Sequence, residues 1–523
     1  MHSGDLQAPA ASAAAAVNGV MLGNTVVVAH TRPAARTAAG FALAWIGYFV
    51  ILWWMPLPQG LTAAGKATLA TTVWAASMWV SEAIPPAVSG LLIPLLLTLG
   101  GAIPAFSGAA AGFAAPVTFL CLSAFIFSAV MQAAGLDRRI ALSLLDRFKA
   151  RTANGVIWSL FGVNLLLSLV VPAANARAAA LLPVTNGITS LFGASPRESN
   201  AKKAIVIQTL VYGSMISGMC ILTAHLPNMV VAGLLEKQLA YRISYLDWLR
   251  LQWPYLGMFA LTQLWVQFYF KSRCIEIPGG RAAIRDQLAT LAPVAPRDQA
   301  VLAVFGLVAL LWATERLHGI ATENVALIGL SLLFIPGLLG LQWKQIQDRT
   351  IWGTLLLLAG ALSLSAAISA TGLAQWAAGQ LYPLARDHVW WVTLLIVMAV
   401  THVIRLGLLS NVAAVTLIAP IALALAPRLG LHPVAFTLLV SDTDSFAYLL
   451  PTQITAAVIA YSSGTFTMSD YARVGIVSVA IAVLYGTFVM APWYAHLGLP
   501  LWDPSVPQAT ATLAHGWHDG MTQ

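Results

Sequence analysis

Charged side chains are scarce in this sequence. Lys, Arg, Asp and Glu together make up 9% of its 523 residues, whereas hydrophobic residues make up 59% and the mean hydropathy is +0.80. Because soluble domains carry about 25% charged residues, this composition excludes a soluble globular protein. Apolar runs long enough to cross ~30 Å of hydrocarbon recur along the chain, and they predict a polytopic membrane protein.

Cysteines and enzyme motifs are also few or missing. Cys121, Cys220 and Cys274 are widely spaced, so they indicate neither a disulfide framework nor a metal site. The sequence has no P-loop, no H-E-x-x-H motif and no G-x-S-x-G elbow. These absences argue against ATP-driven transport by this chain and against an enzyme.

The net charge of +8 comes from short basic loops. Lys and Arg cluster at 138–151, 197–203 and 271–297, and nothing after Arg473 is basic. Basic loops face the cytoplasm by the positive-inside rule. The sequence therefore predicts a multi-pass inner-membrane protein with a cytoplasmic N-terminus, a periplasmic C-terminus and no nucleic-acid partner.

The apolar runs divide the chain into two transmembrane repeats. They predict an all-α protein with about eleven spans and two re-entrant hairpins that need not cross fully. A flexible cytoplasmic tail is expected at 1–36, and a polar tail at 496–523. The N-terminal repeat at 37–270 and the C-terminal repeat at 299–495 are joined by a cytoplasmic linker at 271–298.

One broken apolar phrase occurs twice. The run V-V-P-A-A-N-A-R-A-A-A-L-L-P at 170–183 returns as L-L-S-N-V-A-A-V-T-L-I-A-P at 408–420. A second phrase follows each copy, S-Y-L-D-W-L-R at 244–250 and T-M-S-D-Y-A-R at 467–473. The shared order indicates a duplication whose two hairpins enter from opposite faces. Paired interruptions in inverted repeats are typical of the binding site of a secondary transporter.

Small polar residues at these interruptions are the first site candidates. A backbone break frees amide N–H groups, and half-helix N-termini direct positive dipole ends toward an anion. Asn175 and Asn411 are therefore predicted to bind substrate at the two tips. The alternative for either Asn alone is a hydrogen bond that only joins helices.

Two later interruptions add further candidates. L-T-A-H-L-P-N at 222–228 and L-P-T-Q-I-T at 450–455 place Pro beside polar side chains, so each is expected to unwind. The side chains expected to be able to face the cavity are Thr223, His225, Asn228, Thr452, Gln453 and Thr455. Of these, Asn228, Thr452 and Gln453 are predicted to bind substrate. A lone His on such a segment is more often a packing residue than a ligand, and His225 is interpreted in that way.

Four ionisable residues lie within apolar segments. Arg177 and Arg405 stand beside the two tips, and a charge at that depth marks a functional site by default. Two guanidinium groups suit a substrate with several carboxylates, but each can instead pair with a fixed carboxylate or snorkel to the interface. Asp442 and Asp444 are either those carboxylates or groups that take up protons or cations during coupling.

Four phrases, taken in order, resemble the divalent anion/sodium symporter family of dicarboxylate, citrate and sulfate carriers. They are S-E-A-I-P-P-A-V-S-G-L-L-I-P-L-L at 81–96, V-A-G-L-L-E at 231–236, I-S-Y-L-D-W-L at 243–249, and I-W-G-T-L-L-L-L-A-G-A-L-S-L-S-A-A-I-S-A-T-G-L-A-Q-W at 351–376. The resemblance implies an eleven-span fold with inverted repeats in the lipid bilayer, a homodimer, and an elevator-like movement. It also implies a small anionic substrate.

The hairpin tips depart from the family pattern, in which Ser-Asn-Thr tips bind substrate carboxylates and help coordinate sodium. The second tip keeps Ser410 and Asn411, which are predicted to bind substrate and to form a candidate sodium site. The first tip, P-A-A-N-A-R, is most similar to the P-S-N-T-A-R form of citrate and 2-oxoglutarate/malate exchangers, with Arg177 unchanged. Its two Ala in place of Ser and Asn weaken the first sodium site, so sodium is the one cofactor that the resemblance leaves open.

The sequence therefore predicts a secondary active transporter of di- or tricarboxylates that works by alternating access. Coupling to sodium, coupling to protons and exchange all stay open. A carrier of inorganic or sulfonate oxyanions with the same fold is the alternative. An integral membrane enzyme is the rival from another class, although the loop at 271–298 offers Glu276 and Asp286 but no His. A passive anion channel, whose flux would show no counter-transport, is the third.

Overall fold

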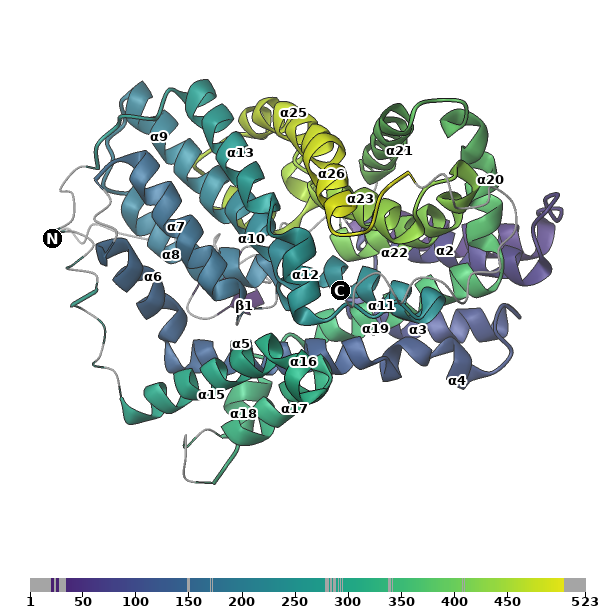
Figure 1. The fold of residues 1–523 in the computed structure, drawn as a ribbon, viewed down its shortest axis with the longest axis horizontal. Coiled ribbons are helices and arrows are strands. Elements are labelled where there is room, and N and C mark those ends of the chain that lie inside the picture. The colour runs from purple at the N-terminus through teal and green to yellow at the C-terminus, as the bar shows by residue number, and fades with distance from the viewer. Residues whose placement is uncertain are drawn as a thin grey trace, which may run out of the picture.

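The computed structural model consists almost wholly of helices (Figure 1), which confirms the predicted all-α, polytopic membrane fold. Most of the expected N-terminal tail, part of the linker at 271–298, Pro172 and the residues after 502 lie outside the described residues. The described residues are 20–22, 25–27, 34–147, 151–169, 171, 173–277, 282, 285, 288, 289, 291, 293, 295–336, 340, 342–406, 408 and 410–502.

Within the segment expected as a flexible tail, the structure describes one short antiparallel pair. Strand β1 (Val20–Leu22) pairs with β2 (Thr25–Val27), with Val20 opposite Val27. The β-branched residues of this segment favour extended backbone, which the Ala-rich composition of the surrounding tail had obscured.

Seven helices in the described part of the chain are long and apolar enough to cross a membrane. They are Thr37–Trp54, Pro116–Ala134, Pro196–Cys220, Pro296–Ala313, Trp352–Ala370, Asn411–Leu429 and Met468–His496. Shorter apolar helices accompany them at Pro86–Leu99, Ala153–Ser168, Thr322–Leu333 and Trp390–Arg405.

The first half contains one helical hairpin, α7 with α8, and one span broken between α10 and α11. Its elements are α1 (Ala34–Phe49), η1 (Val50–Trp54), α2 (Ala63–Ser81), α3 (Pro86–Leu99), α4 (Phe106–Ala109), η2 (Ala111–Ala114), α5 (Pro116–Ala134), α6 (Leu136–Arg147), α7 (Ala153–Ser168), α8 (Ala174–Thr189), α9 (Pro196–Val206), η3 (Ile207–Gly213), α10 (Ser214–Cys220), η4 (Leu222–Ala224), α11 (Leu226–Leu239), α12 (Tyr245–Gln252) and α13 (Tyr255–Phe270).

The second half contains the matching hairpin, α21 with α22, and a span broken between α23 and α24. Its elements are α15 (Pro296–Ala313), α16 (Glu315–His318), α17 (Thr322–Leu333), α18 (Trp343–Gln347), α19 (Trp352–Ala370), α20 (Leu373–Ala385), α21 (Trp390–Arg405), α22 (Asn411–Leu425), η5 (Pro427–Leu429), α23 (Pro433–Ser445), η6 (Pro451–Gln453), α24 (Thr455–Tyr461), α25 (Met468–Tyr485), η7 (Gly486–Met490) and α26 (Ala491–His496).

The two halves repeat one order of elements. The series α5, α6, α7, α8, α10, α11, α13 corresponds to α19, α20, α21, α22, α23, α24, α25. Counting each broken span once, α1, α2, α3, α5, α10/α11, α13, α15, α17, α19, α23/α24 and α25 give the eleven expected spans within the described residues. Because α19 is the fifth span after α5, the two series run in opposite directions, which is the inverted-repeat arrangement.

Proline determines where both spans break. Pro227 occupies the first turn of α11, and Pro451 begins η6. A proline has no N–H to donate and its ring clashes with the preceding turn, so the helix before it must end. The residues just before the second halves, His225 and Ile454, adopt extended backbone with φ of −143° and −137°.

The apolar interior of the described residues falls into two clusters. The smaller one joins α1, α2, α3, α19 and α20, and from the hairpins it includes Ala413. Helices α3 and α19 meet backbone to backbone, because a Cβ added at Gly360 would lie 2.3 Å from the carbonyl oxygen of Gly90. The larger cluster holds both hairpins and both broken spans.

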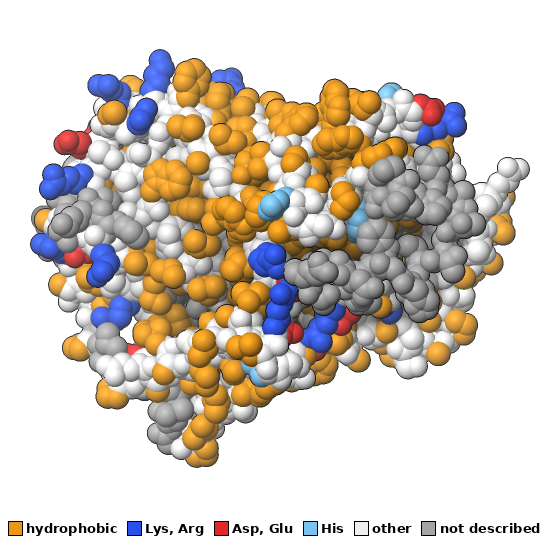
Figure 2. Space-filling view, in the orientation of Figure 1, with side chains coloured by type: hydrophobic (Ala, Val, Ile, Leu, Met, Phe, Trp, Pro, Cys, Tyr) orange, Lys and Arg blue, Asp and Glu red, His pale blue; other side chains and the backbone are white. Residues whose placement is uncertain are grey.

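The surface in Figure 2 is predominantly hydrophobic over the middle of the visible face. Several Lys and Arg side chains gather toward the left end, over the region of α6, α7 and α9 in Figure 1. A hydrophobic face with basic residues toward its margin is typical of a membrane protein whose basic loops lie outside the bilayer.

Candidate functional site

A cavity of about 470 Å³ lies between the two hairpin tips. One wall consists of the N-terminal ends of α8, α11, α22 and α24, and the opposite wall consists of α2, α3 and α19. The polar residues that line it are Glu82, Asn175, His225, Thr354, Ser410, Asn411 and Thr455. A volume of this size suits a small-molecule ligand.

Three helices of substantial length begin at this cavity. The N-cap residues of α8 and α11, Ala173 and His225, accept no side-chain hydrogen bond from the helix that follows. At α22 the Ser410 hydroxyl accepts from the Ala413 amide at 3.4 Å. Amides in a first helical turn have no partner within the helix, so these ends offer N–H donors and positive dipole ends to an anion.

Fixed positive charge does not reach the cavity wall. Among the described residues that line the cavity, none is Lys or Arg, and Glu82 is the acidic one. Glu82 ends α2 in the left-handed region, with φ of 51°. An anion in this cavity would therefore be held by amide dipoles and neutral polar groups. The positive charges nearest to the tips, Arg177 and Arg405, are buried outside the cavity lining.

Arg177 lies behind the first tip, fully buried, and holds two separate loops together. Its Nη1 donates to the carbonyl of Val171 in the hairpin turn at 2.7 Å and to that of Ala224 in the break at 2.8 Å. Its Nη2 donates to the carbonyl of Ser214 at 2.6 Å. No Asp or Glu pairs with Arg177 in the described part of the chain, and its Nε has no partner there.

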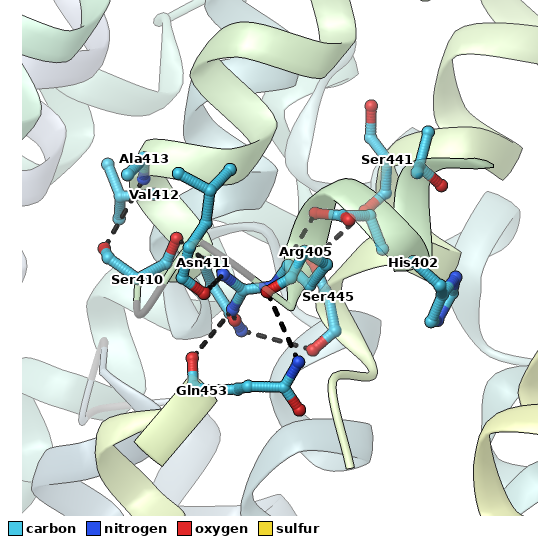
Figure 3. Close-up of polar contacts among 12 residues, drawn as sticks. His402, Arg405, Ser410, Asn411, Val412, Ala413, Ser441, Ser445 and Gln453 are labelled. Atoms are coloured by element: carbon cyan, nitrogen blue, oxygen red, sulfur yellow. Dashed lines mark hydrogen bonds and ion pairs between the residues drawn. The ribbon is translucent and has the colours of Figure 1, made fainter. Parts of the chain in front are cut away.

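Arg405 occupies the corresponding place in the second half (Figure 3). Its Nη1 donates to the carbonyls of Leu408 and Ser410 in the hairpin turn, at 2.6 and 3.0 Å. Its Nη2 donates to the carbonyl of Gln453 in the break at 2.9 Å, and also to Oδ1 of Asn411. The Nε of Arg405 lies 4.0 Å from Oδ2 of Asp444.

The two guanidinium groups thus join the same pair of loops in each half, but they arrive from different helices. Arg177 projects from the second helix of its hairpin, α8, whereas Arg405 is the last residue of the first helix of its hairpin, α21. The repeated feature is the position of the charge between a hairpin turn and a helix break. Aligned sequence positions do not reveal this equivalence.

The polar residues predicted at the later breaks serve the backbone. Nδ2 of Asn228 donates to the carbonyls of Gly218, Met219 and Ile221, at 3.1, 3.4 and 3.0 Å. Oε1 of Gln453 accepts from the amides at 449 and 450, at 3.1 and 2.8 Å. Thr452 is exposed and does not line the cavity.

The two intramembrane acids have different surroundings. Oδ2 of Asp442 accepts from Gln252 at 2.8 Å and from the Tyr494 hydroxyl at 3.1 Å. Asp444 faces Arg405, and neither of its oxygens has a hydrogen-bond partner in the described residues. Asp444 is therefore placed as a charge partner of Arg405, whereas Asp442 belongs to a separate polar cluster.

His225 is the cavity residue that sequence reasoning assigned differently. It was expected to pack, yet its imidazole lines the cavity and its Nε2 has no hydrogen-bond partner in the described part of the chain. The signal in the sequence was its place directly before Leu-Pro, the N-cap position of the half-helix α11.

Asn228 and Asn175, the two asparagines of the first half that were predicted at the site, should behave differently when truncated. Asn228→Ala leaves three carbonyls without their donor, so we expect a lower melting temperature in detergent, from a loss of roughly 1–3 kcal/mol. Asn175→Ala, at the cavity wall, should keep the melting temperature and weaken anion binding. Thermal unfolding with and without added dicarboxylate measures both, and equal behaviour of the two variants would contradict the assignment.

Comparison with known proteins gives consistent matches over most of the chain. The family model described as the sodium:sulfate symporter transmembrane region matches residues 38–499. A protein of Cupriavidus necator described as a membrane protein is 32% identical over 466 residues, covering 85% of this chain and 90% of that protein. The sodium-dependent dicarboxylate transporter SdcS of Staphylococcus saprophyticus is 26% identical over 472 residues, covering 85% and 90%.

A solved structure shares the fold. The crystal structure of the Alcanivorax borkumensis YdaH transporter superposes with a TM-score of 0.50 at 16% sequence identity, covering 84% of this chain and 100% of that one. At this identity the likeness concerns the arrangement of the helices alone.

Proposed function

This chain belongs to the sodium:sulfate symporter family, the divalent anion/sodium symporters, and on that premise we propose that it exchanges small di- or tricarboxylates across the membrane without sodium. That it is a secondary transporter of anions in a membrane follows from the family. The carboxylate class is supported by the relatives described as dicarboxylate transporters. The sodium-free exchange is supported by the two buried arginines.

We infer that sodium does not bind at either tip. In carriers of this architecture, carbonyls of unwound backbone coordinate the coupling cation. Here one or two carbonyls of each hairpin turn and one carbonyl of each break accept from Arg177 or Arg405. Oδ1 of Asn411 also accepts from Arg405, so the candidate sodium site at Ser410 and Asn411 already has a cation beside it. We infer that each guanidinium takes the place of a coupling ion.

A tethered cation favours exchange over symport. A sodium ion dissociates together with the substrate. The empty binding site of a symporter can therefore move back across the membrane without the charge of that ion. The guanidinium of Arg177 cannot leave, and no acid in the described residues compensates it. An uncompensated charge inside the bilayer costs at least ~2.5–3.5 kcal/mol. The binding site should therefore move readily across the membrane only when an anion is bound.

The smaller hydrophobic cluster, which holds α1, α2 and α3, supports an elevator-like movement, and α19 and α20 contribute residues to both clusters. We propose that the body with both hairpins and both breaks carries the anion past a static body built on α1, α2, α3, α19 and α20. The cavity lies between these bodies, because its opposite walls come from one and the other. The static bodies of two copies are proposed to form a homodimer in the inner membrane, with the N-terminus cytoplasmic and the C-terminus periplasmic.

Counterflow in proteoliposomes tests the proposed function. Vesicles loaded with succinate, malate, 2-oxoglutarate, citrate, sulfate or taurine are diluted into the same labelled anion. We expect saturable uptake with the carboxylates, much faster into loaded than into empty vesicles, and unchanged when choline replaces sodium. Uptake that requires sodium would contradict the role of the arginines. Counterflow with sulfate or taurine alone would instead establish an oxyanion carrier.

A further inference from the structure

His225 combines three features that a packing residue does not need. Its side chain is 4% exposed, yet it forms part of the cavity wall. It is the N-cap of α11, but its side chain accepts no hydrogen bond from that helix. Its Nε2 is buried without a hydrogen-bond partner in the described residues. A buried polar atom left without a partner is costly, and a ligand is one way to supply that partner.

The backbone around His225 is built to hold the imidazole at this place. A Cβ added at Gly218 would lie 2.5 Å from Nη2 of Arg177 and 3.4 Å from Cβ of His225. The glycine therefore brings the arginine and the histidine together across the break. The charge of Arg177 is directed to backbone carbonyls, whereas His225 forms part of the cavity wall.

We propose that His225 binds the transported anion directly, donating a ring N–H to one of its oxygens, and that it thereby determines which anions the carrier accepts. This inference rests on the proposed function of the cavity. It adds a residue of the break between α10 and α11 to the amide donors of α8 and α22 at the tips. The imidazole then supplies a directed hydrogen bond to the anion, whereas the charged side chains of Arg177 and Arg405 do not line the cavity.

The geometry favours an anion with oxygen acceptors at two ends. Asn175, Ser410 and Asn411 line the cavity from the hairpin tips, while His225 lines it from the break in α10/α11. A dicarboxylate offers one carboxylate to the tips and a second to the imidazole. A site built to hydrogen-bond a substrate group rejects analogues that lack it, because its own polar atom then stays unpaired.

The test compares His225→Leu and His225→Asn with the wild type in purified, full-length protein. For succinate we expect the dissociation constant and the KM of exchange to rise about tenfold or more in His225→Leu, with a smaller rise in His225→Asn, which keeps an N–H donor. The affinity for propionate, which lacks the second carboxylate, should change little in either variant. The melting temperature without ligand should not fall, because Nε2 of His225 has no hydrogen-bond partner among the described residues.

His402→Leu is the matched control. His402 is also a buried histidine with an unpartnered Nε2 in the described residues, but its Nδ1 contacts the carbonyl of Met398 and it does not line the cavity. We expect its succinate affinity to equal that of the wild type. Unchanged affinity in His225→Leu, or a lower ligand-free melting temperature in both His225 variants, would overturn the inference. If wild-type protein neither binds nor exchanges any carboxylate, the proposed function fails instead.

Discussion

Replacing Arg405 with alanine is expected to abolish sodium-free exchange and to create a protein that binds sodium. The substitution removes donors from the carbonyls of Leu408, Ser410 and Gln453 and from Oδ1 of Asn411. These oxygens then surround a space of cation size next to the carboxylate of Asp444. Oxygen ligands of this kind suit a hard cation.

Sodium titration of the melting temperature makes this expectation measurable. A ligand that binds only the folded state stabilises it by ~2.7 kcal/mol at a hundredfold excess over its Kd. Sodium should therefore raise the melting temperature of Arg405→Ala and leave that of the wild type unchanged, with choline as the ionic-strength control. Arg177→Ala should respond in the same direction through the carbonyls of Val171, Ser214 and Ala224.

Arg386→Ala is the control for loss of an arginine as such. Arg386 is half-exposed and pairs with the neighbouring Asp387, far from any break. It should retain exchange and show no sodium response. If Arg405→Ala does not fold, the variant Arg405→Lys tests the role of the guanidinium instead. A compact ammonium cannot reach all the oxygens that the planar guanidinium joins, so we expect folded protein with exchange reduced about tenfold or more. Wild-type exchange in Arg405→Lys and Arg405→Ala would contradict the proposal.

Gly475→Ala is expected to prevent correct folding of the second break. A Cβ at Gly475 would lie 1.7 Å from the carbonyl oxygen of Tyr448 and 2.7 Å from its carbonyl carbon. The obstacle is backbone, in the unwound segment that leads to η6, and it cannot turn aside as a flexible side chain would. Overpacking a well-packed interior costs ~1–3 kcal/mol, and a backbone clash of this depth should exceed that range.

Gly306→Ala provides the matched comparison, because a Cβ at Gly306 in α15 would meet nothing within 4 Å. Alanine is the better helix former, so this variant should be as stable as the wild type or more stable. Size-exclusion profiles and melting temperatures in detergent compare the two. A monodisperse Gly475→Ala protein with wild-type stability and exchange would show that α25 does not press on the break as the structure has it.

Much of the architecture follows from local sequence signals. The two hairpins and the two breaks were predicted because small residues, Asn and Pro interrupt apolar runs in a repeated order. Pro227 does lie in the first turn of α11, and Pro451 begins η6 within the second break. The depth of Arg177 and Arg405 was equally predictable, since each lies in a long apolar run. Such signals act within a few residues, so a linear reading captures them.

The direction of each polar side chain was not predictable in the same way. Asn228 and Gln453 were expected to face the cavity, but both bind backbone that the break leaves unpaired. His225 was expected to pack, but it lines the cavity. Which polar group satisfies a freed carbonyl and which remains for a ligand depends on several loops meeting at one place. The sequence alone does not show which polar side chain will bind the backbone and which will remain available to a ligand.

The sequence by itself determined the membrane class, the inverted duplication and the positions of the interruptions, because hydrophobicity and proline act locally. Only the tertiary structure decided what the two arginines do. Each reaches a carbonyl 47 or 48 residues away in the chain, Ala224 from Arg177 and Gln453 from Arg405, and these contacts exist only when hairpin and broken span pack together. The arrangement places a fixed cation behind each tip, hydrogen-bonded to carbonyls of the hairpin turn and of the helix break.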